Sequence, residues 1–214
     1  MKVLFCRIAY MKNYKGINCN EQSPDYDVPQ GNNIKYVNET KDGHERYNFL
    51  PKDDGYCYGF VETGFRNENL NDLTQRNTIH IEYIEDCESM KKEDFVDGVL
   101  VVWCSPMDYL GCVVGWYKNA TVYRKRQQQN KWEDTDGYHI KVKASKENVV
   151  LLSKEERSSG KWNAFYCKKN VFGFGQSAIW YGKREKTQKY VEKEVKDLVN
   201  KILSYKVDNR YEIT

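Results

Sequence analysis

The stretch from Val99 to Arg124 constrains the fold more than any other part of the chain. It holds two apolar runs separated by a short polar loop, with Trp103 in the first run and Trp116 in the second. β-Branched and aromatic residues favour extended structure, and two such runs joined closely are typical of an antiparallel hairpin. We therefore expect a sheet that is organised around this hairpin.

Polar side chains accompany the tryptophans of the hairpin. The loop carries Ser105, Asp108 and Tyr109, and the second run continues through Tyr117 and Asn119. Aromatic rings beside amide and carboxylate groups can stack on a flat ligand and bond its polar edge. The alternative is that these rings only fill a β core, and residue pattern alone leaves both interpretations open.

Further runs alternate between apolar and polar residues in the manner of strands. Only one segment has helical spacing, and no strand–helix–strand rhythm occurs, so a doubly wound parallel sheet is excluded. This set of predicted strands with one helix favours an α+β domain with mainly antiparallel strands in a barrel-like arrangement. The expected strands outside the hairpin are Val3–Tyr10, 35–37, Tyr56–Glu62, Thr78–Ile84, Tyr138–Ala144, Asn148–Leu152, Trp162–Tyr166 and Ala178–Tyr181, with a helical turn at Lys91–Val96.

The remaining segments indicate one domain over residues 1–214. Residues 18–56 are rich in Asn, Asp, Gly and Pro and predict a long ordered loop. Residues 186–204 carry an apolar stripe at helical spacing, which predicts an amphipathic C-terminal helix that docks on the sheet.

Charge is distributed unevenly along the chain. Residues 1–100 hold 18 Asp and Glu against 12 Lys and Arg, and residues 101–214 hold 13 against 22, which gives net charges of −6 and +9. A basic half in a weakly charged protein is the electrostatic pattern expected for a polyanion partner, although solvated lysine-rich surfaces give the same count.

Seven scattered cysteines without a closely spaced pair favour a reduced, cytoplasmic protein. No apolar run approaches the length of a membrane span, so we expect no membrane partner.

The chain lacks a convincing catalytic signature. Its three histidines are dispersed, and no nucleophile elbow, Walker loop or zinc-protease motif occurs. We therefore expect a binding domain rather than an enzyme, with no cofactor, metal or catalytic residues. One weaker alternative is a metal-dependent nuclease that uses the acids and lysines around one strand, namely Asp134, Asp136, Lys141 and Lys143.

A second tryptophan lies near hydroxyl and amide groups, since Trp180 follows a glycine-containing loop with Ser177. Together with the hairpin, this combination suits a flipped or unpaired base. The predicted base-binding residues are Trp103, Ser105, Asp108, Tyr109, Trp116, Tyr117, Asn119, Ser177 and Trp180. The predicted phosphate-binding residues are Arg124, Lys125, Arg126, Lys168, Lys169, Lys183 and Arg184.

Five short motifs resemble an N-terminal module that precedes HNH-type or other nuclease domains in bacterial restriction proteins. They are MKxYxG (11–16), GHERYNF (43–49), CYGFV (57–61), GWYKNATVYR (115–124) and GQSAIWY (175–181). The resemblance implies the specificity domain of a modification-dependent restriction system, similar in fold to the PUA, EVE and YTH group, whose barrels hold a modified base in an aromatic cage.

The chain departs from this pattern at two places. It contains no HNH motif, so any cutting activity would belong to a separate nuclease subunit, and Ala178 stands where the pattern has Asn. Our leading hypothesis is a module that recognises a modified base in DNA, methylated or hydroxymethylated. Recognition of RNA by a similar cage is a further alternative.

Overall fold

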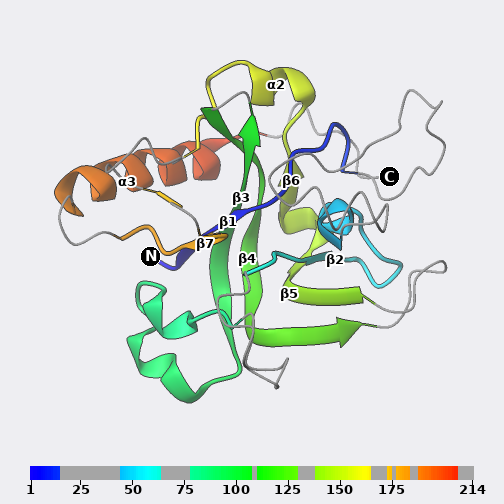
Figure 1. Ribbon diagram of the computed structural model, residues 1–214, viewed down its shortest axis with the longest axis vertical. Coiled ribbons are helices and arrows are strands. Elements are labelled where there is room, and N and C mark those ends of the chain that lie inside the picture. The colour runs from blue at the N-terminus through cyan, green and yellow to red at the C-terminus, as the bar shows by residue number, and fades with distance from the viewer. Residues whose placement is uncertain are drawn as a thin grey trace.

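A long antiparallel hairpin forms the centre of the computed structural model (Figure 1). The structure describes residues 1–14, 44–63, 78–107, 110–129, 138–164, 173–174, 177–183 and 188–206. Strand β3 covers Phe95–Met107 and strand β4 covers Leu110–Gln129, so both are longer than the average strand. The hairpin predicted from the two apolar runs is confirmed.

Five further strands extend the hairpin into a seven-stranded sheet. The order is β2–β5–β4–β3–β1–β7, and β6 pairs with β4 beside β5. Strand β1 is parallel to β3, and every other pairing is antiparallel. A mixed α+β protein with a mainly antiparallel sheet is therefore confirmed. The bounds are β1 Val3–Arg7, β2 Tyr56–Gly59, β5 Tyr138–Ser145, β6 Val149–Leu151 and β7 Ile179–Trp180.

Bulges change the course of the hairpin part-way along its length. The register between β3 and β4 shifts between Val96 and Val99, where Gly98 has a φ of +75°. Asn119 on β4 has a φ of +49°, and its Oδ1 lies 3.8 Å from the position that a Cβ on Gly98 would take. Glycine and asparagine are the residues that adopt this left-handed conformation most readily. The two bulges therefore lie side by side and interrupt the regular pairing, which resumes at Val96 and Val122.

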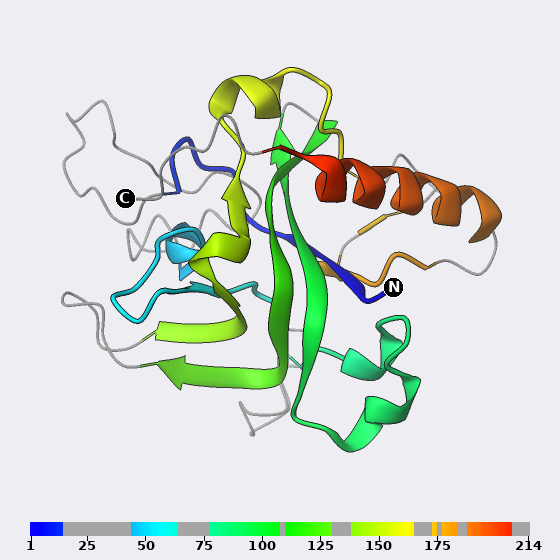
Figure 2. The same cartoon turned by 180° about the vertical axis from the view of Figure 1, so that it is seen from behind.

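Helix α3, Gln188–Ser204, covers one face of the sheet. Both views place it beside the part of the hairpin that pairs with β1 and β7, away from β2 and β5 (Figures 1 and 2). Its buried side chains confirm the apolar stripe of the predicted C-terminal helix. They join Val3, Phe5, Trp116 and Trp180 in what we call the helix-side cluster, to which α3 contributes Val195, Leu198, Val199 and Ile202.

A larger apolar cluster occupies the opposite face. It includes Trp103 and Tyr117 of the hairpin together with Val122 of β4 and Val142 of β5. Side chains from irregular segments close it, among them Tyr14 and Phe49. The hairpin is therefore buried on both faces over much of its length.

The predicted strand at Thr78–Ile84 is wrong. This segment contains the 3-10 helix η2, Ile81–Tyr83, and a second one, η3, follows at Glu88–Lys92. Ile79, Ile81 and Ile84 are all buried in the larger cluster. The apolar alternation is satisfied by this packing, and the backbone makes turn bonds instead of ladder bonds.

The other predicted elements are partly described. The helical turn predicted at Lys91–Val96 overlaps η3 only at Lys91 and Lys92, and the prediction is wrong at its other end, where β3 begins at Phe95. The described end of the predicted loop 18–56 contains the 3-10 helix η1, His44–Tyr47, and the short strand at 35–37 lies outside the described residues. Two short helices complete the described elements, η4 at Lys146–Asn148 and α2 at Lys154–Ser158. No helix in these described segments is long and apolar enough to cross a membrane.

Gly115→Ala tests how closely the strands approach at the centre of the hairpin. A Cβ on Gly115 would lie 2.1 Å from the carbonyl oxygen of Val150 on β6 and 2.7 Å from the ring of Phe49. Because the first neighbour is backbone, the pairing of β4 with β6 must shift, which we expect to lower the free energy of unfolding by about 1–3 kcal/mol. Urea unfolding followed by tryptophan fluorescence measures this. Lys118→Ala, at a half-buried position of the same strand, is the control, and equal midpoints for the two variants would contradict the prediction.

Candidate nucleic-acid interface

The structure does not bring Trp103 and Trp116 together. Trp103 pairs with Gly115, and Trp116 pairs with Val102, so the two tryptophans differ by one step in the ladder. Neighbouring positions on a strand point to opposite faces. Trp103 consequently lies in the larger cluster and Trp116 in the helix-side cluster, both fully buried. The two predicted base-binding rings therefore lie on opposite faces of the sheet and do not form one pocket.

Most other predicted base-binding residues are also buried among, or bonded to, groups of the protein itself. Tyr117 packs edge-on against Trp103 with ring centroids 5.3 Å apart, and Ser105 is buried. Trp180 is buried beside Phe5, and the Ser177 hydroxyl accepts a hydrogen bond from the backbone of Ile179 at 3.1 Å. Asp108 and Tyr109 lie outside the described residues.

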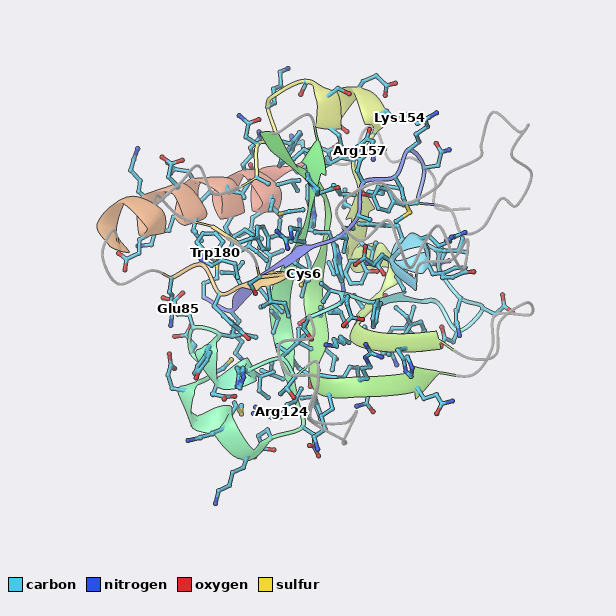
Figure 3. The ribbon with its side chains drawn as sticks, viewed as in Figure 1. Cys6, Glu85, Arg124, Lys154, Arg157 and Trp180 are labelled. Atoms are coloured by element: carbon cyan, nitrogen blue, oxygen red, sulfur yellow. The ribbon has the colours of Figure 1, made fainter. Side chains whose placement is uncertain are left out.

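Two of the predicted phosphate-binding arginines are held by protein groups. Arg124 bonds the Glu82 carboxylate at 2.7 Å and the carbonyl oxygens of Met90 and Glu93, so it fixes η2 and η3 against β4 (Figure 3). Arg126 bonds the Glu62 carboxylate at 2.8 Å. The three bonds of Arg124 involve all three of its guanidinium nitrogens, whereas Arg126 is bound to Glu62 through one of them.

The predicted lysines differ in their surroundings. Lys125 is exposed on β4, and Lys183 is exposed with its Nζ 3.5 Å from the Glu88 carboxylate. Lys168, Lys169 and Arg184 lie outside the described residues. Lys125 is therefore one predicted phosphate-binding residue whose side chain is exposed on a strand.

Buried charges form a separate group that residue pattern did not indicate. The Glu45 carboxylate accepts hydrogen bonds from the backbone N–H groups of Ala9, at 2.6 Å, and Glu62, yet burial raises the pKa of Glu45 to about 7. Burial lowers the pKa of Lys141 to about 7, partly offset by the Glu62 carboxylate.

Lys141 belongs to the residues of the nuclease alternative. It donates to the Thr63 hydroxyl at 2.7 Å and is fully buried. Asp134 and Asp136, the acids of that alternative, lie outside the described residues. Within the described segments no group of three or more His, Cys, Asp or Glu could hold a metal ion.

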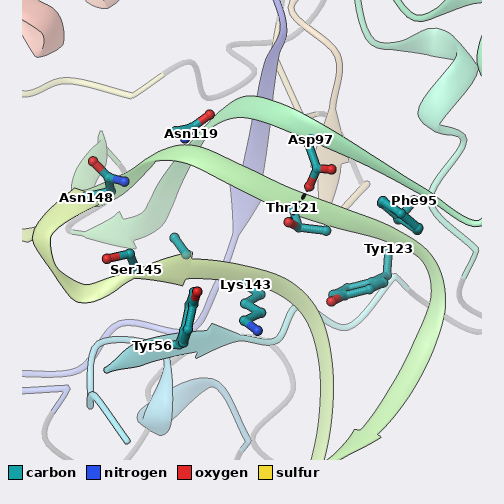
Figure 4. A pocket seen from close by; sticks show the side chains of 10 residues that line it. Tyr56, Phe95, Asp97, Asn119, Thr121, Tyr123, Lys143, Ser145 and Asn148 are labelled. Atoms are coloured by element: carbon teal, nitrogen blue, oxygen red, sulfur yellow. Dashed lines mark hydrogen bonds between the residues drawn. The ribbon is translucent and has the colours of Figure 1, made fainter. Parts of the chain in front are cut away.

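An open groove of about 470 Å³ crosses strands β3, β4, β5 and β2 on one face of the sheet (Figure 4). Along β4, Asn119, Thr121 and Tyr123 line the groove and alternate with Ala120 and Val122 of the larger cluster. The period of two along a strand thus places one set in the core and the other on the open face. The groove is lined by Tyr56, Phe95, Asp97, Asn119, Thr121, Tyr123, Lys143, Ala144, Ser145 and Asn148.

Aromatic rings stand at both ends of this groove (Figure 4). Phe95 is 50% exposed, and its ring centroid lies 6.2 Å from that of Tyr123. Tyr56 is 37% exposed at the other end and lies 6.4 Å from Tyr58. Exposed rings grouped on a strand face offer apolar surface for a flat ligand.

Lys143 lies between the two groups of rings. Its Nζ is 3.8 Å from the centroid of Tyr56 and 5.7 Å from that of Tyr58, both within cation–π range. The ammonium is therefore held over Tyr56, on the side of the groove that faces this ring, where an anionic group of a ligand can reach it.

Polar groups complete the lining. The Thr121 hydroxyl donates to Asp97 at 2.5 Å (Figure 4). The amide side chains of Asn119 and Asn148 also line the groove. Burial raises the pKa of Tyr123, and the Asp97 carboxylate adds to the rise. The groove therefore offers a carboxylate, amides and an ammonium between aromatic rings.

Of the predicted base-binding residues, Asn119 alone among those that the structure describes lines this groove. Residue pattern identifies Tyr56 and Tyr123 only as parts of strands and Phe95 only as part of a helical turn. Aromatic residues on the same face of β2, β4 and β3 are the signal that could have identified the groove, but the signal can be recognised only once the strand order is known.

Trp116→Ala separates a core role from a site role. Because the ring packs against Trp162 and Tyr205 within the helix-side cluster, we expect a loss of about 3–5 kcal/mol in the free energy of unfolding. Trp116→Phe should lose less, since it keeps one ring. Chemical denaturation followed by circular dichroism measures both variants. A Trp116→Ala protein as stable as the parent would contradict the core role of Trp116.

Glu45→Gln tests the buried carboxyl group. Because the pKa of Glu45 is raised from 4.5 to about 7 in the folded protein, its contribution to stability is fully present below pH 4.5 and is lost as the pH rises to about 7. The loss is on the order of 3 kcal/mol. Glutamine does not ionise, so the variant should lack this fall.

Urea unfolding at pH values between 4.5 and 8 measures the difference. Lys141 affects stability in a separate pH range. Because its pKa is lowered from 10.5 to about 7 in the folded protein, the unfolded chain binds the extra proton between these values and stability rises with pH above about 7. Glu155→Gln, an exposed change on α2, is the control. Parallel curves for the Glu45→Gln protein and the parent would contradict the assignment.

A scan against protein-family models found no match, and searches of curated proteins and of solved structures also found none.

Proposed function

We propose that this chain is a nucleic-acid-binding module that receives an unpaired or flipped DNA base in the groove lined by Tyr56, Phe95 and Tyr123. The observation that carries the proposal is the pair of exposed aromatic groups with Lys143 between them. Aromatic residues on the open face of neighbouring antiparallel strands are a common way for proteins to hold unpaired bases.

The stacking surfaces explain why bases fit this groove. Tyr56 and Phe95 project from strands on either side of β4 and β5, so a ring stands at each end of the groove, and the Lys143 ammonium lies over one face of Tyr56. Stacking on an aromatic side chain contributes about 1–3 kcal/mol per base. A base that stacks on these rings would remove their exposed apolar area from water.

The cations supply the second part of the interaction. Lys143 lies at the groove itself, and Lys125 is exposed on β4 two residues beyond Tyr123. Ammonium groups contact backbone phosphates as point charges and make affinity depend on salt. The +9 net charge of residues 101–214 favours such a partner.

The finer form of the proposal comes from the resemblance of the motifs. In this form, the module recognises a methylated or hydroxymethylated base and is the specificity part of a restriction system with a separate nuclease subunit. Its sheet would then belong to a PUA-like, barrel-like fold. Asn119 and Asn148 are the amide groups available in the groove for the edge of such a base.

Binding of dye-labelled oligonucleotides, measured by fluorescence anisotropy at fixed salt, tests the proposal. The ligands are single-stranded DNA, matched RNA, and duplexes with methylated, hydroxymethylated or unmodified bases. We expect Phe95→Ala to weaken binding of the best ligand by about 1–3 kcal/mol because one stacking surface is removed. Lys143→Ala should reduce the slope of affinity against salt by about 0.7 for each phosphate of a single strand that the ammonium neutralises in the parent protein.

Leu203→Ala and Lys193→Ala on α3 are the matched controls, since both residues are exposed away from the groove. If they weaken binding as much as the groove variants do, the groove is not the site. Equal weak binding of every ligand would overturn base recognition, and preference for RNA would overturn DNA as the partner.

A further inference from the structure

We propose that the groove distinguishes cytosine from thymine and uracil, through a hydrogen bond from the 4-amino group of cytosine to the carboxylate of Asp97. The proposal rests on the proposed function, because it names the base that the groove would hold. Thymine and uracil have the same ring size as cytosine and differ at this edge by a carbonyl group. The selection therefore depends on polar groups and not on the volume of the groove.

Asp97 is the one acidic side chain among the described residues that line the groove. It lies on β3 two residues after Phe95, so both side chains are on the same face, at a spacing of roughly 7 Å along the strand. Thr121 and Tyr123 have the same relation on β4, and Figure 4 shows Asp97 directed toward Thr121. A base that stacks on Phe95 or Tyr123 therefore has its edge near the Asp97–Thr121 pair.

The Thr121 hydroxyl fixes both the position and the polarity of this pair. It donates to Oδ1 of Asp97 at 2.5 Å, which commits its proton to the carboxylate. A carboxylate has about four acceptor positions, so Asp97 keeps the capacity to accept from a ligand. The pair consequently presents an acceptor to the edge of the base.

An acceptor at this position favours one pyrimidine edge over the other. Asp and Glu side chains accept from the N4 amino group of cytosine. The O4 carbonyl of thymine or uracil would face the carboxylate with its own lone pairs, and both groups would lose water without a bond in return. Lys143 and the amide of Asn119 line the same groove and carry the donor groups that the ring acceptors of cytosine require.

Competition between two homopolymers tests the inference. Labelled oligo(dC) and oligo(dT) of about 12 nucleotides, a length within the usual range for single-strand sites, are titrated with the full chain at fixed salt and slightly alkaline pH. We expect oligo(dC) to bind at least about fivefold more tightly than oligo(dT). In Asp97→Asn this ratio should approach one, because an amide can also donate to a carbonyl.

The ratio is the decisive quantity, since loss of a negative charge strengthens binding of both oligonucleotides. Asp197→Asn, the same substitution at an exposed position of α3, should leave the ratio unchanged. The ratio of the parent protein decides the inference even if Asp97→Asn fails to fold. Tight binding of both homopolymers with a ratio near one overturns the cytosine preference alone, whereas binding of neither overturns the proposed function as well.

Discussion

The structure depends on the burial of the β3–β4 hairpin from both sides. Consecutive residues of this hairpin alternate between two apolar clusters, so Trp103 and Trp116 stabilise different faces of one ladder. Each fully buried large side chain contributes on the order of 2–3 kcal/mol through removal of apolar area from water. A two-sided strand pair of this kind fixes its register strongly, because a slip of one residue would exchange the two faces.

The groove exists because this two-sided burial ends part-way along the hairpin. Helix α3 covers the face that contains Trp116, and beyond the paired bulges at Gly98 and Asn119 the open face presents Thr121 and Tyr123. The other face continues into the larger cluster through Val122, which keeps the strands in place. A rigid sheet with one open face is well suited to bind ligands, since its side chains are positioned before the ligand arrives.

The charged residues have two different roles in this arrangement. Arg124 and Arg126 connect β4 to the segments packed against it, through Glu82 and Glu62 respectively. Lys143 instead stands over Tyr56 at the edge of the groove. Of these three cations, two are held in structural ion pairs and one lies at the groove.

The sequence by itself determined the hairpin, the mainly antiparallel sheet and the amphipathic helix α3, because these depend on local periodicity. Asn119 was the one described residue of the predicted base-binding set that lines the groove. The segment Thr78–Ile84 shows where periodicity was insufficient, since buried isoleucines in a 3-10 helix gave the same apolar pattern as a strand. Only the tertiary structure decided which rings are buried and which line the groove. That outcome depends on the bulges, the strand order and the reach of α3, all of which join residues far apart in the chain.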